Sequence, residues 1–300
     1  MLAKKNFEQA EQYYREALIL DSCFVDALNN LGTVAYHQKK YDEALAFYTH
    51  AINCQPEFLN AYFNRSNVYY ELKEYYNALK DLDKLIAKKP DTPIVYFSRG
   101  LIYAKLRDFD QAKRAFQTAR QFQPHEVEIL VNLGVIFYYE KKYDSANVLL
   151  MQAEQLNPKE ANVYNALSMI ECERENYPKA MEWIEKALSL KPRDPYYLNN
   201  RGYIYLLTNK LDLALIDIDL SISLDPTNAW AYRNKGIYYL KTGSVDSSIR
   251  LLTQAEKMEP FVEKINYYLG LAFQKKGDVN KSREYFDKAA VLHEVEQNEK

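Results

Sequence analysis

Residues with special backbone or ligand chemistry are scarce in this chain of 300 residues, which has 8 glycines, 10 prolines, 3 cysteines and 4 histidines. No group of glycines is dense enough to form a phosphate-binding loop, and no GxSxG nucleophile motif is present. The histidines form no HxxxH pair, and the cysteines are odd in number and without a CxxC spacing. We therefore expect no catalytic residue, no cofactor, no metal and no disulfide, with Cys23, Cys54 and Cys172 as reduced thiols.

A strong charge bias and long hydrophobic runs are also missing. The formal net charge is -2, so composition gives no reason to expect nucleic acid as a partner. The longest nearly continuous apolar run, at 129–139, is too short to cross a bilayer, and the first residues lack an apolar signal core. We expect no direct membrane insertion and a cytoplasmic location, or a periplasmic or envelope-anchored one if an upstream signal was removed.

A repeat of 34 residues runs through the sequence. The stretches at 41–56 and 109–124 share two aromatic residues, two alanines and a closing proline, and further steps of 34 recover the skeleton without insertions. With each unit numbered from 1 to 34 and Val25 at position 1, position 20 is always small. It is occupied by Ala10, Ala44, Ala78, Ala112, Ala146, Ala180, Ala214, Ser248 and Ser282.

The few glycines and prolines follow the same period. Six glycines stand at position 8, where we expect a second helix to cross closely at position 20, and the other two stand at position 15. Seven prolines close a unit at position 32, while Pro93 and Pro195 begin helices after the N-cap residues Thr92 and Asp194. Each unit is therefore predicted to contain two short antiparallel helices, A and B, which bury their apolar faces by stacking on neighbouring units.

This unit resembles the tetratricopeptide repeat over nearly all of the chain. The resemblance rests on Leu28, Leu31, Gly32, Ala44, Tyr48, Ala51 and Pro56. It implies an all-α solenoid, a right-handed superhelix of antiparallel helix pairs whose concave face is lined by the A helices and holds peptides or protein segments. The pentatricopeptide family, which reads RNA, uses a longer unit. The implied domains are a partial repeat at 1–24, repeats at 25–58, 59–92, 93–126, 127–160, 161–194, 195–228, 229–262 and 263–296, and a tail at 297–300.

Both ends of this array look incomplete. Residues 1–24 supply only the end of an A helix and one B helix, and residues 293–300 follow the last B helix without the polar helix that usually shields a solenoid end. We expect a fragment of a longer array, or ends that are covered by other chains or by self-association.

Two trios of charged residues repeat one pattern, with a cation at position 7 and an aspartate at position 23. They are Arg65, Asp81 and Arg99, and Arg201, Asp217 and Lys235. Position 7 is leucine in other repeats and faces inward, so a charge there needs a partner. We expect each aspartate to lie between the cation of its own repeat and that of the next, as a structural ion pair and not as a ligand site.

The concave face carries the functional prediction. In the geometry that the resemblance implies, positions 2, 5, 6, 9, 12 and 13 line it, and position 6 is asparagine in five of eight complete repeats. An asparagine amide can both donate to and accept from a peptide backbone, and exposed aromatic rings offer large contact areas. The alternative is that asparagine is simply common there. The predicted peptide-binding residues are Asn30, Asn64, Asn132, Asn200, Asn234, Tyr36, Phe63, Tyr70, Phe97, Tyr138, Tyr203, Trp230 and Arg233.

One stripe on the outer side is unusually apolar. Leu213, Ile216 and Leu220 stand where other B helices carry polar residues, and their spacing places them on one helix face. The stripe is either a second contact site or dimer seam, or it is buried by a neighbouring helix.

These observations favour a non-catalytic scaffold that binds an extended peptide or protein segment, preferably an apolar or aromatic one, in the groove. The alternatives are a targeting or regulatory segment of a larger enzyme or envelope-anchored protein, and a self-assembling structural array.

Overall fold

The computed structural model describes residues 2–292, with side chains from residue 9 onward. Within this range there are seventeen helices and no strand, and they form two compact units, residues 1–146 and 147–300, whose boundary falls inside α9. The helices are α1 (Leu2–Leu20), α2 (Val25–His37), α3 (Tyr41–Cys54), α4 (Leu59–Glu71), α5 (Tyr75–Lys88), α6 (Pro93–Lys105), α7 (Phe109–Phe122), α8 (Val127–Tyr139), α9 (Tyr143–Leu156), α10 (Ala161–Glu173), α11 (Tyr177–Leu190), α12 (Pro195–Leu207), α13 (Leu211–Leu224), α14 (Ala229–Thr242), α15 (Val245–Met258), α16 (Ile265–Lys276) and α17 (Val279–Val291).

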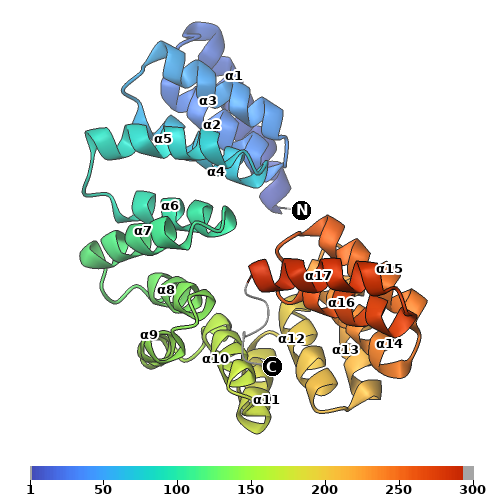
Figure 1. Cartoon of the computed structure of the whole chain (residues 1–300). Helices are drawn as coiled ribbons and strands as arrows, with labels where there is room; N and C mark the ends of the chain where they lie inside the picture. Colours follow the sequence, from blue (N-terminus) through green and yellow to red (C-terminus); the bar gives the residue numbers. More distant parts are fainter. Residues whose placement is uncertain (1, 293–300) are drawn as a thin grey trace. The chain divides into compact units, whose positions relative to one another are not determined.

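In the N-terminal unit, consecutive helices pair as hairpins: α2 packs on α3, α4 on α5 and α6 on α7. Each B helix then packs on the A helix of the next repeat, as α3 does on α4, α5 on α6 and α7 on α8 (Figure 1). A single hairpin cannot bury both of its apolar sides, so this stacking extends one hydrophobic core from repeat to repeat.

The C-terminal unit repeats the arrangement with α10 to α17, again as hairpins of consecutive helices (Figure 1). The A helices also pack on one another in series, α10 on α12, α12 on α14 and α14 on α16, as α2 does on α4 in the N-terminal unit. The predicted all-α class is therefore confirmed in both units. Among residues 2–292 no helix combines the length and the apolar character needed to cross a membrane.

Small residues allow the two helices of a hairpin to approach closely. At position 20, Ala44, Ala78, Ala112, Ala146, Ala180, Ala214 and Ser248 have no exposed surface. Where serine takes one of these positions, the hydroxyls of Ser168 and Ser282 donate to a backbone carbonyl across the hairpin, whereas that of Ser66 donates to Phe63 in its own helix. The Oγ–O distance is 2.8 Å from Ser168 to Ala180 and 3.1 Å from Ser282 to Gly270.

The glycines at position 8 lie against a large side chain of helix B. A Cβ atom on Gly100 would stand 2.4 Å from Cε1 of Phe116, and one on Gly32 would stand 2.5 Å from Cε1 of Tyr48. A real Cβ atom does not approach another carbon this closely. The predicted close approach is confirmed, but the residue that enforces it stands at position 24, one helical turn beyond the position 20 that the sequence indicated.

The turn between helices A and B places position 15 in the left-handed region in every complete repeat. Gly243 and Gly277 have φ of 88° and 85° there. Six other residues adopt φ between 58° and 60° at this position: Lys39, Lys73, Arg107, Lys141, Glu175 and Asn209. This conformation costs an L-residue about 1–2 kcal/mol, so packing of the two helices must impose it where glycine is absent.

Helix starts agree in part with the prediction. The carboxylate of Asp194 caps α12 by accepting from the backbone N–H groups of Tyr196 at 3.0 Å and Tyr197 at 3.2 Å. Thr92 stands at the N-cap of α6, but its side chain makes no capping hydrogen bond. Proline at the first position already fixes the backbone of α6 for a helical start.

The expectation of three reduced thiols is wrong for two of them. Cys23, in the turn before α2, forms a disulfide with Cys54 at the end of α3, with Cα atoms 5.5 Å apart. A CxxC spacing is the wrong test in a repeat array, because residues about one repeat apart become spatial neighbours. Cys172 is free, and burial raises the pKa of its thiol to about 12. His293 lies outside the described residues.

We predict that Gly100→Ala and Gly243→Ala both lower the free energy of unfolding, for different reasons. The first forces a Cβ against Phe116 and should cost about 1–3 kcal/mol. The second has open space around it and should cost about 1 kcal/mol through its left-handed backbone. Urea denaturation of each variant alone and combined with Phe116→Leu separates the two, because only the Gly100 variant should couple to position 116. Equal coupling energies in the two cycles would contradict the steric explanation.

Candidate functional site

Three tyrosines at position 12 of the A helices in the N-terminal unit share one environment. Tyr36, Tyr70 and Tyr138 are half-buried, and each ring contacts the tyrosine at position 17 that opens the next B helix. The ring centroids are 5.9 Å apart in all three pairs, Tyr36–Tyr41, Tyr70–Tyr75 and Tyr138–Tyr143. The rings are therefore held in place by the hairpin itself, with part of each left accessible.

Burial also sets the protonation of these tyrosines. It raises the pKa of Tyr70 to about 12, and it raises that of Tyr36, where the charge of Glu71 adds to the effect. Both hydroxyls therefore stay neutral at physiological pH and remain available as hydrogen-bond donors.

Phe63 and Phe97 occupy position 5 of α4 and α6 and are also half-buried. The ring of Phe97 lies 5.7 Å from that of Phe116, and Phe63 packs on the core around Leu82. Both rings thus contribute to their own hairpins and retain a partly accessible face.

The asparagines at position 6 bind one another across repeats. Asn64 Nδ2 donates to Asn29 Oδ1 at 2.9 Å, Asn200 Nδ2 to Asn165 Oδ1 at 2.8 Å, and Asn234 Nδ2 to Asn199 Oδ1 at 2.8 Å. Each bond joins position 6 of one A helix to position 5 of the A helix before it. These asparagines at position 6, called the asparagine ladder below, therefore have a structural role that was not predicted from the sequence.

Two asparagines of the ladder bind differently. Asn132 Nδ2 donates at 2.8 Å to the backbone oxygen of Glu128 in its own helix. Asn30 is half-buried in α2. Among the side chains that the structure describes, neither ties one repeat to the next, so both can be changed without breaking such a bond.

Arg233 and Asn234 are buried in the C-terminal unit, with 6% and 0% of their surface exposed. Arg233 Nε donates to Asn234 Oδ1 at 3.0 Å, and its Nη1 donates to the backbone oxygen of Glu263 at 2.7 Å. The guanidinium also stands 4.9 Å from the centroid of the Tyr203 ring. The chain's own polar groups surround these two residues, which leaves little of either side chain exposed for the predicted ligand.

Other inner residues of the C-terminal unit also bind the unit itself. The hydroxyls of Tyr203 in α12 and Tyr268 in α16 lie 3.5 Å apart, and Trp230 Nε1 donates to the carboxylate of Glu263. Lys264 Nζ lies 3.4 Å from the carboxylate of Glu173, which ends α10. Side chains of α10, α12, α14, α16 and the turn before α16 therefore bond to one another on this side of the unit.

The predicted ion pairs form within repeats. Arg65 binds Asp81 in a bidentate pair with both distances at 2.8 Å, and Arg201 binds Asp217 at 2.7 and 2.9 Å. Asp81 and Asp217 are buried, and each pair joins helices A and B of one repeat. Both predicted pairs therefore form, and each joins two helices of the chain itself.

The expected link from each aspartate to the cation of the next repeat is wrong. Arg99 binds Asp83 at 3.2 Å, and Lys235 binds Asp219 at 2.7 Å. Both partners stand at position 25, two residues after the expected aspartate. Position 25 points at the following A helix, whereas position 23 points at its own, so one aspartate cannot serve both cations.

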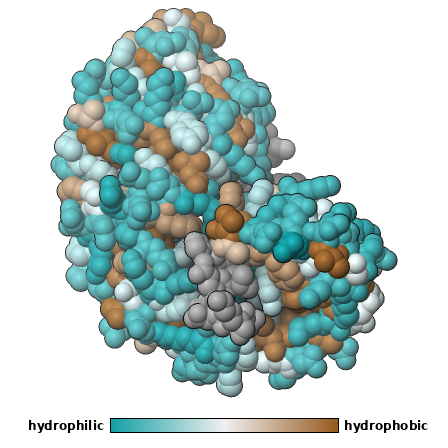
Figure 2. All heavy atoms as spheres, in the orientation of Figure 1, coloured by the Kyte–Doolittle hydropathy of each residue, from teal (hydrophilic) through white to brown (hydrophobic). Residues whose placement is uncertain are grey.

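The apolar stripe on α13 is exposed. Leu213, Ile216 and Leu220 show 46%, 63% and 37% of their surface. The alternative of burial by a neighbouring helix is therefore wrong within the described residues. In Figure 2 apolar side chains gather in small groups on a mostly hydrophilic surface.

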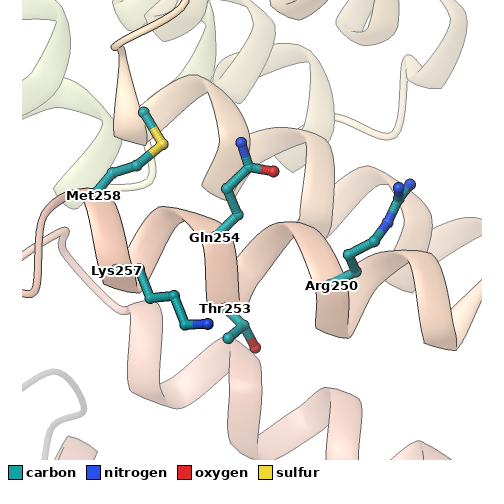
Figure 3. Close-up of a pocket in the computed structure, with 5 residues that line it drawn as sticks. All are labelled: Arg250, Thr253, Gln254, Lys257 and Met258. Atoms are coloured by element: carbon teal, nitrogen blue, oxygen red, sulfur yellow. The ribbon is translucent and has the colours of Figure 1, made fainter.

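A pocket of about 500 Å³ lies on α15 and was not predicted. All five lining residues come from this one helix, and Figure 3 shows their side chains leaving it in different directions. They are Arg250, Thr253, Gln254, Lys257 and Met258. Such a set does not converge on one point, so it offers no catalytic constellation.

Family models establish the class of this protein. Models of the tetratricopeptide repeat match residues 25–58, 195–228 and 233–297, and a model of the N-terminal tetratricopeptide repeat region of Psidin matches residues 65–200. The chain belongs to the tetratricopeptide repeat family. No curated protein matches it by sequence.

Solved structures share this fold at low sequence identity. A chain of the APC/C hetero-tetramer Cut9–Hcn1 is 18% identical, with a TM-score of 0.67, over 97% of this chain and 57% of its own length. A tetratricopeptide repeat protein from Parabacteroides merdae is 18% identical, with a TM-score of 0.70, over 83% and 98%. YrrB, a tetratricopeptide repeat protein with an unusual peptide-binding site, is 20% identical, with a TM-score of 0.51, over 63% and 97%. The chain thus spans just over half of the Cut9–Hcn1 chain.

We predict that Asp81→Ala lowers the free energy of unfolding by about 3 kcal/mol, because it leaves the guanidinium of Arg65 without its buried partner. The matched control is Asp83→Ala, which removes an exposed ion pair and should cost less than about 1 kcal/mol. Chemical denaturation of both variants measures the difference. Similar losses in the two variants would contradict the structural role of the Arg65–Asp81 pair.

We predict that the free energy of unfolding falls as the pH rises from about 10 to about 12. Burial raises the pKa of Tyr70 from 10.0 to about 12, so between these values the tyrosine is ionised in the unfolded chain and neutral in the folded one. Its contribution is fully present below pH 10 and is lost above it. Urea denaturation at a series of alkaline pH values should show a shallower decline for Tyr70→Phe, and an unchanged decline would contradict the assignment.

Proposed function

We propose that this chain is a non-catalytic protein-interaction scaffold that binds an extended peptide or protein segment on the A-helix face of its N-terminal unit. This face is defined by the residues at positions 5, 6 and 12 of α2, α4, α6 and α8. The prominent ones are Asn30, Tyr36, Phe63, Asn64, Tyr70, Phe97, Asn132 and Tyr138. The observation that carries the proposal is that these side chains are all partly exposed, whereas Arg233 and Asn234, at positions 5 and 6 of α14, are buried and bind one another.

Preorganisation supports this choice of face. Tyr36, Tyr70 and Tyr138 rest on tyrosines of the B helices, so a ligand need not order them on binding. The amide of Asn64 uses one N–H for Asn29, and its remaining donor and acceptor suit the alternating groups of an extended backbone. YrrB shows that a fold of this kind can hold a peptide.

The charges that flank the A-helix face indicate the chemistry of the ligand. At positions 2 and 13 of these A helices, Asp26, Glu71 and Glu128 are exposed, against the single lysine Lys105. An acidic segment would be repelled by this excess of negative charge. We therefore propose an apolar or aromatic segment of neutral or basic character.

We predict that peptides selected on this protein from a random display library bind Asn30→Arg and Asn132→Arg at least about tenfold more weakly, a loss of about 1.4 kcal/mol. Each change places a bulky charge on the A-helix face and removes no bond between repeats within the described part of the chain. Fluorescence polarisation with the selected peptides measures the affinity, and thermal melting confirms that the variants fold.

The matched control is Asn77→Arg, which makes the same change on the exposed surface of α5. Equal binding by the Asn77 and Asn132 variants, or the failure of any peptide to be enriched, would overturn the proposal.

A further inference from the structure

Three potential metal ligands meet at the first complete repeat. The ligand atoms of Cys23, His50 and Cys54 all lie within 4.8 Å of one another. His50 and Cys54 are four residues apart on α3 and therefore share a helix face, while Cys23 approaches from the turn between α1 and α2. This cluster belongs neither to the A-helix face nor to the ion pairs described above.

The backbone holds the three side chains in place. Asp21 Oδ1 accepts from the N–H of Cys23 at 2.9 Å, which fixes the turn, and Cys54 packs against the core of the first two hairpins. Cys23 and His50 are exposed, and Cys54 is partly so. Their side chains can therefore change rotamer, and an ion can reach them, without unfolding of the repeat.

The meeting of these two cysteine positions follows from stacking and not from the disulfide itself. Cys23 and Cys54 hold position 33 of one repeat and position 30 of the next. At the same two positions one repeat further on, the Glu57 carboxylate and Lys88 Nζ form an ion pair at 3.0 Å. Side chains at these positions thus lie in contact without a covalent bond, and the two cysteines should stay adjacent when reduced.

We propose that Cys23, His50 and Cys54 form a redox-gated site for a thiophilic divalent cation such as Zn²⁺, blocked when the cysteines are joined as a disulfide and competent when they are reduced. In a tetrahedral zinc site, bond lengths of about 2.3 Å to sulfur and about 2.0–2.1 Å to nitrogen place the sulfurs about 3.8 Å apart and each sulfur about 3.6 Å from nitrogen. Those separations fit a cluster whose ligand atoms lie within 4.8 Å and whose cysteine Cα atoms are 5.5 Å apart. Water completes the coordination.

The gating chemistry is balanced by an external reductant. A phosphine or dithiol supplies two electrons, and two protons from the medium or the dithiol complete the conversion of the disulfide to two thiols. Binding of Zn²⁺ then displaces those two protons, so that two thiolates and one neutral imidazole hold the ion. An oxidised chain has no thiolate here and cannot ligate the metal in this way.

The test is titration of the full chain with Co²⁺ and Zn²⁺. The chain is first reduced with a phosphine, and the phosphine is then removed under an oxygen-free atmosphere. Reduced protein should bind one equivalent of Co²⁺ with a sulfur-to-cobalt charge-transfer band and tetrahedral d–d bands, and Zn²⁺ should abolish both. Cys23→Ser and Cys54→Ser should weaken binding by at least about 100-fold. Loss of a residue that only hydrogen-bonds to a metal ligand costs up to about 100-fold, and loss of the ligand itself should cost at least as much. His50→Ala should weaken binding at least about tenfold.

The matched controls keep the same residue types elsewhere. Cys172→Ser removes the only other thiol, and His125→Ala removes an exposed histidine of the same unit, so both should bind like the unchanged chain. Absence of the charge-transfer band in the reduced chain, equal binding by the oxidised chain, or equal affinities of the His50 and His125 variants would overturn the proposal. Circular dichroism monitors folding. If a cysteine variant unfolds, the metal affinities of the His50→Ala and His125→Ala variants still test the proposal.

Discussion

Where glycine stands at position 8 of helix A, its close contact with the residue at position 24 of helix B sets the geometry on which the other contacts depend. There is no room for a methyl group on Gly100 beside Phe116, so this contact fixes the distance between the two helices where they cross. With the hairpins fixed in this way, neighbouring repeats stack in a constant register. Contacts then recur at fixed sequence offsets, as in the bond between Asn64 and Asn29 and that between Asn200 and Asn165.

The two units use similar polar residues to different ends. In the C-terminal unit, Arg233 is satisfied by Asn234 and Glu263, and the hydroxyls of Tyr203 and Tyr268 meet across two repeats. Because these groups bind one another, fewer of their donors and acceptors are left for a ligand. In the N-terminal unit the rings of Tyr36, Tyr70 and Tyr138 instead pack on tyrosines of their own hairpins and stay partly accessible.

Much of the fold could be predicted from the sequence because glycine, proline and alanine obey strict backbone and volume rules. The period of 34, the small residue at position 20 and the Asp194 cap all follow from such rules. What could not be predicted depends on the direction of single side chains. Arg99 reaches Asp83 and not Asp81, because positions 23 and 25 of a helix point about 200° apart.

The candidate site was predictable by position and less so by exposure. The sequence places Asn234 and Asn132 at the same position of different repeats. Only Asn234 accepts a hydrogen bond from a neighbouring arginine, Arg233. The cysteine pair could have been found from the offset of 31 residues, which joins position 33 of one repeat to position 30 of the next. Scanning the repeats at that offset also finds the Glu57–Lys88 pair.

The bond between Cys23 and Cys54 encloses almost all of the first complete hairpin, including the left-handed turn at Lys39. A protease that cut the chain at this turn would leave two pieces still joined through their sulfurs. Under oxidising conditions the N-terminal helix α1 would therefore stay attached after such a nick, whereas under reducing conditions only packing would hold it. While the disulfide is intact, a cut in the backbone between residues 24 and 53 therefore leaves the N-terminal piece covalently joined to the rest of the chain.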